Sequence, residues 1–190
     1  MFLDFDSILT EFFSFNSFYS DEFIKIYKAI NEECWSLYRL NKLSKEDLRS
    51  IRFLKTLEYF GISDQIIAEQ IGQEYVNNSP KRTILIDGCH ELLIYLKNKY
   101  QLHIITNGFE EIQSKKMESS KILNYFDVII TSESVGVKKP NPKVFHHALK
   151  LADANIENSI MIGDSIEADI LGALNIGMQA IHCNFDEADI

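Results

Sequence analysis

The stretch 159–177, SIMIGDSIEADILGALNIG, joins an apolar run to a helical pattern through a few polar residues. Residues 159–163 are apolar without polar alternation, which is typical of a parallel strand covered on both faces. Residues 166–176 predict a helix that ends at Gly177, because glycine is favoured at helix C-caps. A buried strand followed by a helix is the repeating unit of an α/β domain.

Further apolar runs of the same kind occur along the chain, and we expect each to form a strand: residues 2–5, 102–106, 127–131 and 178–182. Helical patterns lie between them. Residues 88–100 form one, with Asp87 as its expected N-cap. Residues 142–152 form another, with Asn141 as N-cap and Pro142 at the first helical position. This alternation predicts an α/β fold built on a doubly wound parallel sheet of about five strands.

One segment does not alternate. The first two predicted strands are separated by residues 6–101, far more than a crossover needs. Three helical patterns lie within this segment, at 21–40, 45–60 and 64–76, and the second begins at Ser44 like a capping box. We therefore expect a helical domain at 16–81, inserted into a core formed by 1–15 and 82–190. The aromatic tract EFFSFNSFY at the junction either packs as a hinge or lines a pocket between the domains.

Composition excludes several classes of function. The 190 residues are 46% hydrophobic, enough for a real core, and the net charge of −9 disfavours nucleic acid or a membrane surface as partners. Three widely spaced cysteines lack metal-ligand or redox spacing, so we expect reduced thiols in a cytoplasmic protein. The start of the chain lacks a signal-peptide pattern, and no apolar run approaches the roughly 20 residues of a membrane span.

Chemistry-bearing residues follow the predicted strands, where ligands bind in parallel α/β sheets. Asp4 and Asp6 end the first strand, two residues apart and therefore on the same side. The second strand ends at Thr106, Asn107 and Gly108, the third is followed by SESVGVKKPNP, and the fourth by GDSIEAD. Two clustered carboxylates repel one another unless a cation or a hydrogen-bond donor lies between them.

This set resembles the haloacid dehalogenase (HAD) superfamily of aspartate-nucleophile hydrolases in all four of its motifs and in their order. Its Asp-x-Asp motif matches Asp4 and Asp6, although Ile8 departs from the usual Thr or Val. The second motif matches Thr106, the third Lys139 before Pro140. The fourth, Gly-Asp-Ser-x-x-x-Asp, matches the residues Gly163, Asp164, Ser165 and Asp169. The resemblance implies a Rossmann-like core with a helical cap of the C1 type.

The resemblance also implies roles. Asp4 is the expected nucleophile and Asp6 the general acid–base. Asp4, the backbone carbonyl of Asp6, and Asp164 are the expected ligands of a Mg²⁺ cofactor, which prefers oxygen ligands. Such a cation would make the clustered carboxylates tolerable.

A second set of residues is expected to hold the phosphoryl group: Thr106, Asn107 through its amide, Gly108 and Lys139. Asp169 is expected to orient the lysine or the metal's waters, with Ser165 beside it.

Each residue also has a plainer interpretation. Asp4 and Asp6 could form a polar strand end, and Thr106 to Gly108 an ordinary turn. Lys138 and Lys139 could lie in a solvated loop. Asp164 could be a helix N-cap and Asp169 a charge on a helix surface. Their joint occurrence in one order favours the site.

The acid at Asp6 favours phosphoryl transfer, because dehalogenases of the superfamily lack it. The segment 106–117, TNGFEEIQSKKM, resembles the pyrimidine 5′-nucleotidase branch. The expected substrate is thus a small phosphate monoester, a nucleoside 5′-monophosphate. Alternatives are a sugar-phosphate phosphatase or phosphomutase with the same core, and a non-catalytic binding module. The sequence leaves the oligomeric state open.

Overall fold

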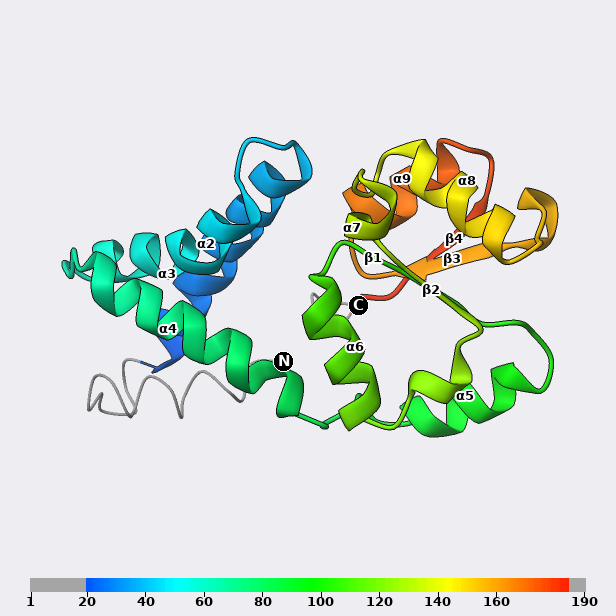
Figure 1. The fold of residues 1–190 in the computed structure, drawn as a ribbon, viewed down its shortest axis with the longest axis horizontal. Coiled ribbons are helices and arrows are strands. Elements are labelled where there is room, and N and C mark those ends of the chain that lie inside the picture. The colour runs from blue at the N-terminus through cyan, green and yellow to red at the C-terminus, as the bar shows by residue number, and fades with distance from the viewer. Residues whose placement is uncertain (1–19, 185–190) are drawn as a thin grey trace. The chain divides into compact units, whose positions relative to one another are not determined.

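The computed structural model describes residues 20–184 (Figure 1). The predicted strand 2–5, with Asp4 and Asp6, and the aromatic tract 11–19 lie outside the described residues, so those expectations stay predictions. Within the described part no helix is long and apolar enough to cross a membrane.

Contacts divide the chain into two compact units. The first is Met1–Leu85 with Lys115–Ser120, and the second is Ile86–Ser114 with Lys121–Ile190. Within residues 20–184 each unit has its own secondary structure: the first contains three long helices, and the second contains the strands described below. The domain bounds predicted from the sequence stay a prediction.

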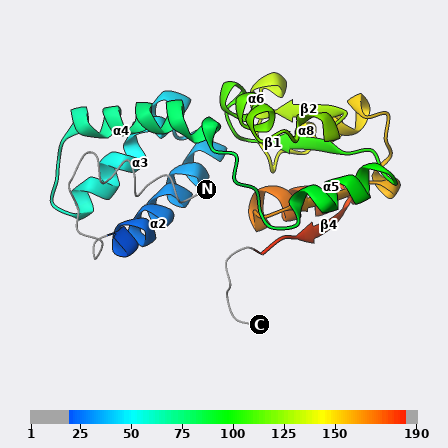
Figure 2. The same cartoon turned by 90° about the horizontal axis from the view of Figure 1, so that it is seen from below.

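The first unit is helical over its described residues. It contains α2 (Ser20–Arg39), α3 (Lys45–Tyr59), α4 (Gln65–Asn78) and the short 3₁₀ turn η1 (Ser79–Lys81). These elements confirm the three predicted helices, and α3 packs against both α2 and α4 (Figure 2). The expected cap at Ser44 is also confirmed: its Oγ accepts a hydrogen bond of 3.0 Å from the Asp47 N–H. Such a cap satisfies one of the free N–H groups at the helix start.

An apolar cluster holds the three helices together. Its buried members come from all three: Phe23, Tyr27, Phe53, Leu57, Ala68 and Ile71. The rings of Tyr27 and Phe53 stack with centroids 5.4 Å apart, and Phe23 stacks on Phe60 at 5.5 Å. A Cβ on Gly72 would lie only 2.5 Å from the Arg49 carbonyl oxygen. The missing side chain therefore lets α3 and α4 approach closely.

The described part of the second unit contains four strands in two parallel pairs. β1 (His103–Thr106) pairs with β2 (Val128–Thr131), and β3 (Ile160–Gly163) pairs with β4 (Gln179–His182). Each strand begins one residue after its predicted start and ends at the predicted residue. The four predictions are confirmed, and the registers bring the ends of paired strands side by side.

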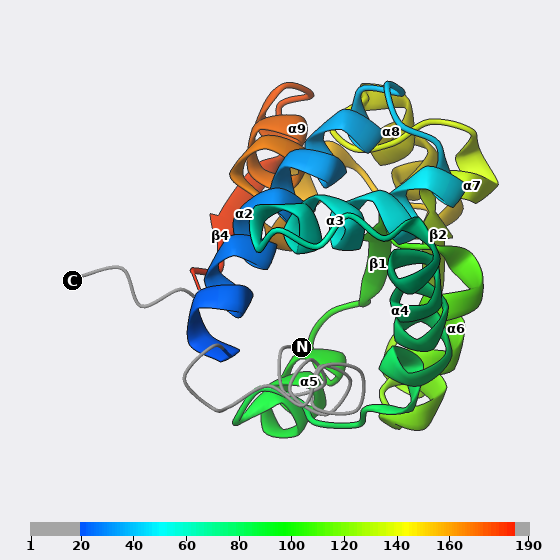
Figure 3. The ribbon, with the colours of Figure 1, turned by 90° about the vertical axis from the view of Figure 1, so that its left-hand side faces the viewer.

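Helices follow or precede each strand of this unit. They are α5 (Cys89–Lys97), α6 (Glu110–Ser119), α7 (Ser132–Val135), α8 (Pro142–Leu151) and α9 (Gly172–Leu174). Shorter turns are η2 (Leu123–Tyr125), η3 (Ile156–Asn158) and the π-helical η4 (Ile166–Leu171). α8 and α9 lie on one side of the strands and α5 on the other (Figures 1 and 3). This is the layering of a doubly wound α/β core.

The core of this unit lies between the strands and the helices α8 and α9. Phe145, Ala173 and Met178 are buried there, and Met161 of β3 packs against them. The opposite face of β3 differs from the expected coverage on both faces, because Ile160 is 48% exposed. Among the described residues, β3 thus has one packed face.

Two helix predictions need correction. The cap of α5 is Gly88, with φ +77°, and not Asp87, because the chain enters the helix through a left-handed residue without a side-chain cap. The predicted helix 166–176 divides into η4 and α9, because hydrogen bonds to Ser165 include the wider i→i+5 spacing of a π turn. The helix also ends earlier than predicted, because α9 stops at Leu174 with Asn175 as its C-cap. Gly177 follows in the turn, in a left-handed conformation with φ +82°.

Candidate active site

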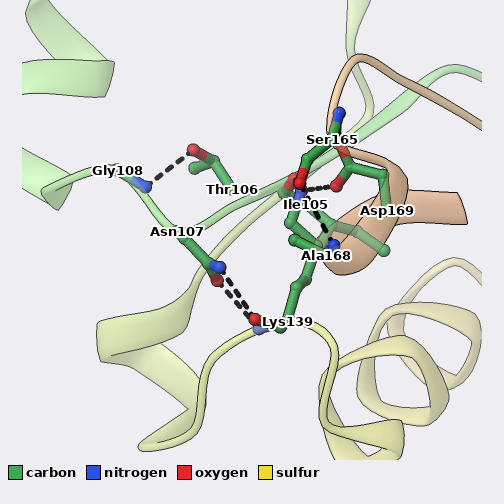
Figure 4. A network of polar contacts seen from close by, with 8 residues as sticks. All are labelled: Ile105, Thr106, Asn107, Gly108, Lys139, Ser165, Ala168 and Asp169. Carbon is green, nitrogen blue, oxygen red and sulfur yellow. Dashed lines mark hydrogen bonds and ion pairs between the residues drawn. The ribbon is translucent and has the colours of Figure 1, made fainter. Parts of the chain in front are cut away.

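Polar side chains gather where β1 and β3 end and on the loop after α7 (Figure 4). Thr106 ends β1, Gly163 ends β3, and Lys139 lies on the loop between α7 and α8. All belong to the second unit. The structure thus brings together three of the four sequence motifs, and the motif of Asp4 and Asp6 lies outside the described residues.

Lys139 is the centre of this group, and only 7% of its surface is exposed. Its ammonium donates hydrogen bonds to the Ile105 carbonyl oxygen, at 2.7 Å, and to Oδ1 of Asp169, at 2.5 Å. A lysine ammonium has three N–H donors, so one proton remains for a ligand. The interpretation of Lys139 as part of a solvated loop is wrong.

Asp169 is buried with it, at 4% exposure, and is not a charge on a helix surface. Its Oδ2 accepts a hydrogen bond of 3.1 Å from the Ser165 N–H, so both carboxylate oxygens have protein partners. A Cβ on Gly163 would overlap the Asp169 carboxylate. Glycine at this position therefore makes room for the ion pair, and the π turn η4 carries Asp169 to it.

The end of β1 forms a tight turn. The Gly108 N–H donates to Oγ1 of Thr106 at 2.9 Å, which leaves the Thr106 hydroxyl proton to donate elsewhere. The Asn107 side chain is directed at the Lys139 backbone and makes two hydrogen bonds to it. A Cβ on Gly108 would meet the flexible end of the Gln113 side chain, so a larger residue here would require that side chain to move.

Asp164 lies at the end of β3, with its side chain exposed. It is not the N-cap of the following turn, because Ser165 takes that position and its Oγ accepts from the Ala168 N–H at 3.1 Å. The backbone oxygen of Asp164 lies 3.1 Å from Nε2 of His182. Its carboxylate has no hydrogen bond to another described residue, and such an oxygen donor fits a hard cation such as Mg²⁺. Within residues 20–184, no three acidic, histidine or cysteine side chains form a metal-binding group.

The lysine next to Lys139 has a shifted pKa. Burial lowers the pKa of Lys138, while the nearby Glu133 carboxylate acts to raise it. Glu133 accepts a hydrogen bond of 3.2 Å from the Glu110 N–H at the start of α6. A carboxylate at this position is favourable because the first N–H groups of a helix carry partial positive charge.

Sequence reasoning missed three of these contacts. The Ile105 carbonyl has no signal in the sequence, because every residue carries one. The sequence predicted a role for the Asn107 backbone amide alone, whereas its side chain binds the Lys139 backbone, a contact that asparagine commonly makes. The hydrogen bond from the Glu110 N–H at the start of α6 to Glu133 joins residues 23 positions apart, so only the fold brings them together.

A family model described as haloacid dehalogenase-like hydrolase matches residues 13–183. The chain belongs to this family. The range contains Thr106, Lys139, Asp164 and Asp169, and it confirms the resemblance and the fold class inferred from the motifs. The haloacid dehalogenase-like fold places the ends of its parallel strands at one edge, where the polar group described above lies.

Similar proteins carry hydrolase names. The pyrimidine 5′-nucleotidase YjjG of Escherichia coli is 30% identical over 175 residues, which cover 91% of this chain and 76% of YjjG. A glyceraldehyde 3-phosphate phosphatase of Methanothermobacter thermautotrophicus is 43% identical over 93 residues, or 48% of this chain and 41% of that one.

A solved structure is similar over most of the chain. The magnesium-bound HAD-hydrolase YfnB of Bacillus subtilis matches with a TM-score of 0.80 and 28% identity, covering 89% of this chain and 75% of YfnB. The likeness in fold thus extends over both the helical unit and the unit with the strands.

Proposed function

We propose that this haloacid dehalogenase-like hydrolase cleaves phosphate monoesters, with Mg²⁺, through an aspartyl-phosphate intermediate, and that its substrate is a nucleoside 5′-monophosphate. The observation that carries the proposal is the buried ammonium of Lys139. Two of its protons are fixed by Ile105 and Asp169, and the third is left for an anionic ligand. Thr106, at the end of β1, has a hydroxyl proton that it can donate to the same ligand.

The proposed reaction has two displacements. An oxygen of Asp4 attacks phosphorus, so an O–P bond forms while the bond from phosphorus to the ester oxygen breaks. Asp6 gives its proton to the departing alkoxide. Asp6 then takes a proton from water, which attacks the phosphorus of the aspartyl-phosphate and releases inorganic phosphate and free Asp4. The assignments of Asp4 and Asp6 rest on the sequence pattern.

The remaining groups bind the charge that moves in each step. Lys139, the Thr106 hydroxyl and the backbone N–H of Asn107 would hold the phosphoryl oxygens, with Gly108 shaping the turn that presents them. Asp169 and the Ser165 N–H keep the ammonium in place. Asp4, the backbone carbonyl of Asp6, and Asp164 would hold Mg²⁺, which when bound would neutralise charge between the carboxylates and the phosphate.

A nucleotide is the favoured substrate because YjjG, similar over most of both chains, is a pyrimidine 5′-nucleotidase. The second candidate is a small sugar phosphate, since a glyceraldehyde 3-phosphate phosphatase is 43% identical over 93 residues. We further propose that the helical unit, predicted to span 16–81, acts as a cap that selects among these esters. Fold alone does not fix the substrate.

A substrate panel tests the proposal. The purified chain is assayed with Mg²⁺ on pyrimidine and purine nucleoside 5′-monophosphates, glyceraldehyde 3-phosphate and p-nitrophenyl phosphate. We expect the highest kcat/KM on a pyrimidine nucleotide, no turnover by Asp4→Asn, and loss of activity in EDTA that added Mg²⁺ restores. A higher kcat/KM on glyceraldehyde 3-phosphate than on any nucleotide would assign a sugar phosphate as the substrate. Full activity in EDTA would show that the reaction does not need the metal.

A further inference from the structure

The side chain of Asn107 pairs with the backbone of a residue far along the chain. Its Nδ2 donates to the Lys139 carbonyl oxygen at 3.0 Å, and its Oδ1 accepts from the Lys139 N–H at 2.8 Å (Figure 4). The two residues are 32 positions apart. The Asn107 amide thus pairs with the Lys139 backbone as a neighbouring strand would, and it satisfies both the N–H and the C=O of Lys139.

The same strand end also holds the other end of Lys139. The ammonium donates to the Ile105 carbonyl, two residues before Asn107, and Asp169 binds the same ammonium. Lysine has a flexible four-carbon side chain, so fixing the ammonium alone leaves the backbone free to shift. Fixing both ends leaves one place for the third ammonium proton.

We propose that the Asn107 side chain is a positioning residue that sets the place of Lys139 for phosphoryl transfer. The catalytic part of this inference rests on the proposed function. It is separate from the role of the Asn107 backbone N–H, which any residue at position 107 would keep. Asparagine suits the role because one planar group offers a donor and an acceptor side by side, whereas aspartate offers acceptors alone.

The first test compares two asparagines. Asn107→Ala removes the two hydrogen bonds, and Asn141→Ala is the matched control, because Asn141 lies on the same loop but caps α8 by accepting from the Lys143 N–H. We expect kcat of Asn107→Ala to fall up to about 100-fold with a smaller change in KM, since small displacements of a catalytic group cost that much. Asn141→Ala should lower the melting temperature and keep kcat. Equal effects of both variants on kcat would overturn the proposal.

A double-mutant cycle tests whether Asn107 acts through the ammonium. Lys139→Ala keeps the backbone groups that Asn107 binds but removes the ammonium. In that background Asn107→Ala should cause no further loss of kcat on p-nitrophenyl phosphate. A loss as large as in the wild-type background would show that Asn107 acts on another group.

Hydrogen exchange keeps the test independent of activity and of a fragile Lys139→Ala variant. The Lys139 amide should exchange faster in Asn107→Ala than in wild type, while amides of α3 in the helical unit stay unchanged. Unchanged exchange at Lys139 would overturn the pairing itself. If the wild-type chain hydrolyses none of the esters, the proposed function fails while this measurement still decides the pairing. Faster exchange with unchanged kcat would overturn the positioning role alone.

Discussion

The ammonium of Lys139 and the carboxylate of Asp169 lie 2.5 Å apart, with both side chains more than nine-tenths buried. The pair joins the loop before α8 to the π turn after β3. Moving two charges out of water is costly, and their mutual attraction offsets that cost only when both are present and hydrogen-bonded. Ile105 and Ser165 supply the additional hydrogen bonds.

Breaking this pair should destabilise the fold more than replacing it. Lys139→Met or Asp169→Asn alone leaves one buried charge unpaired, so we expect each to cost about 3–5 kcal/mol in the free energy of unfolding. The double variant should lose clearly less than the sum of the two. Urea unfolding of the four proteins measures this, and additive losses would argue against a coupled pair.

Gly163→Ala should disturb the same pair from the opposite side. The new Cβ would overlap the Asp169 carboxylate, so that side chain or the strand end must shift. We expect a loss of about 1–3 kcal/mol in unfolding free energy, the usual cost of overpacking. kcat should fall as well because Lys139 loses its fixed partner. Thermal unfolding and phosphate release check both, and a wild-type melting temperature with wild-type kcat would contradict the crowding.

Asp6→Asn should separate good from poor leaving groups. If Asp6 is the general acid, its loss should lower kcat roughly 10²–10⁴-fold on nucleotides, whose alkoxide needs a proton. On p-nitrophenyl phosphate the loss should be much smaller, since nitrophenolate leaves without one. Circular dichroism and Mg²⁺ titration of the variant serve as controls for folding and metal affinity. Equal losses on both esters would leave Asp6 without the acid–base role.

The three cysteines should differ in reactivity. Cys34 is fully buried in the helical unit, and burial raises the pKa of its thiol, so little reactive thiolate is present near neutral pH. Cys89 and Cys183 are partly exposed. With Ellman's reagent we expect two fast thiols and one slow thiol that reacts only on unfolding. The slow phase should disappear in Cys34→Ala, and three equal rates would contradict the burial of Cys34.

Local pattern decided most of what the sequence predicted correctly. Apolar runs placed β1 to β4 within one residue, and Asn141 with Pro142 placed the start of α8, because strand burial and helix capping depend on neighbouring residues. The failures depend on the fold. The N-cap of α5 is Gly88 and not Asp87, because the chain enters this helix through a left-handed residue, which favours glycine.

The site shows the same division. The motifs predicted that Asp169 orients either the lysine or the metal's waters, and the structure shows its contact with Lys139. The partners of Lys139 on β1 could not be predicted, because one is a backbone carbonyl and the other an amide 32 positions away. Asp4 and Asp6 lie outside the described residues and stay predictions from the pattern.

The burial of Lys139 and Asp169 has a consequence for how such proteins diverge. A descendant that abandoned turnover would still be selected to keep this lysine and this aspartate, since a lone charge in the interior would impair folding. Finding the pair alone in a distant sequence is therefore evidence of common architecture, and it indicates the chemistry only together with the other motif residues. Genome surveys that separate active enzymes from inactive relatives should therefore score the lysine only together with the two acids that match Asp4 and Asp6.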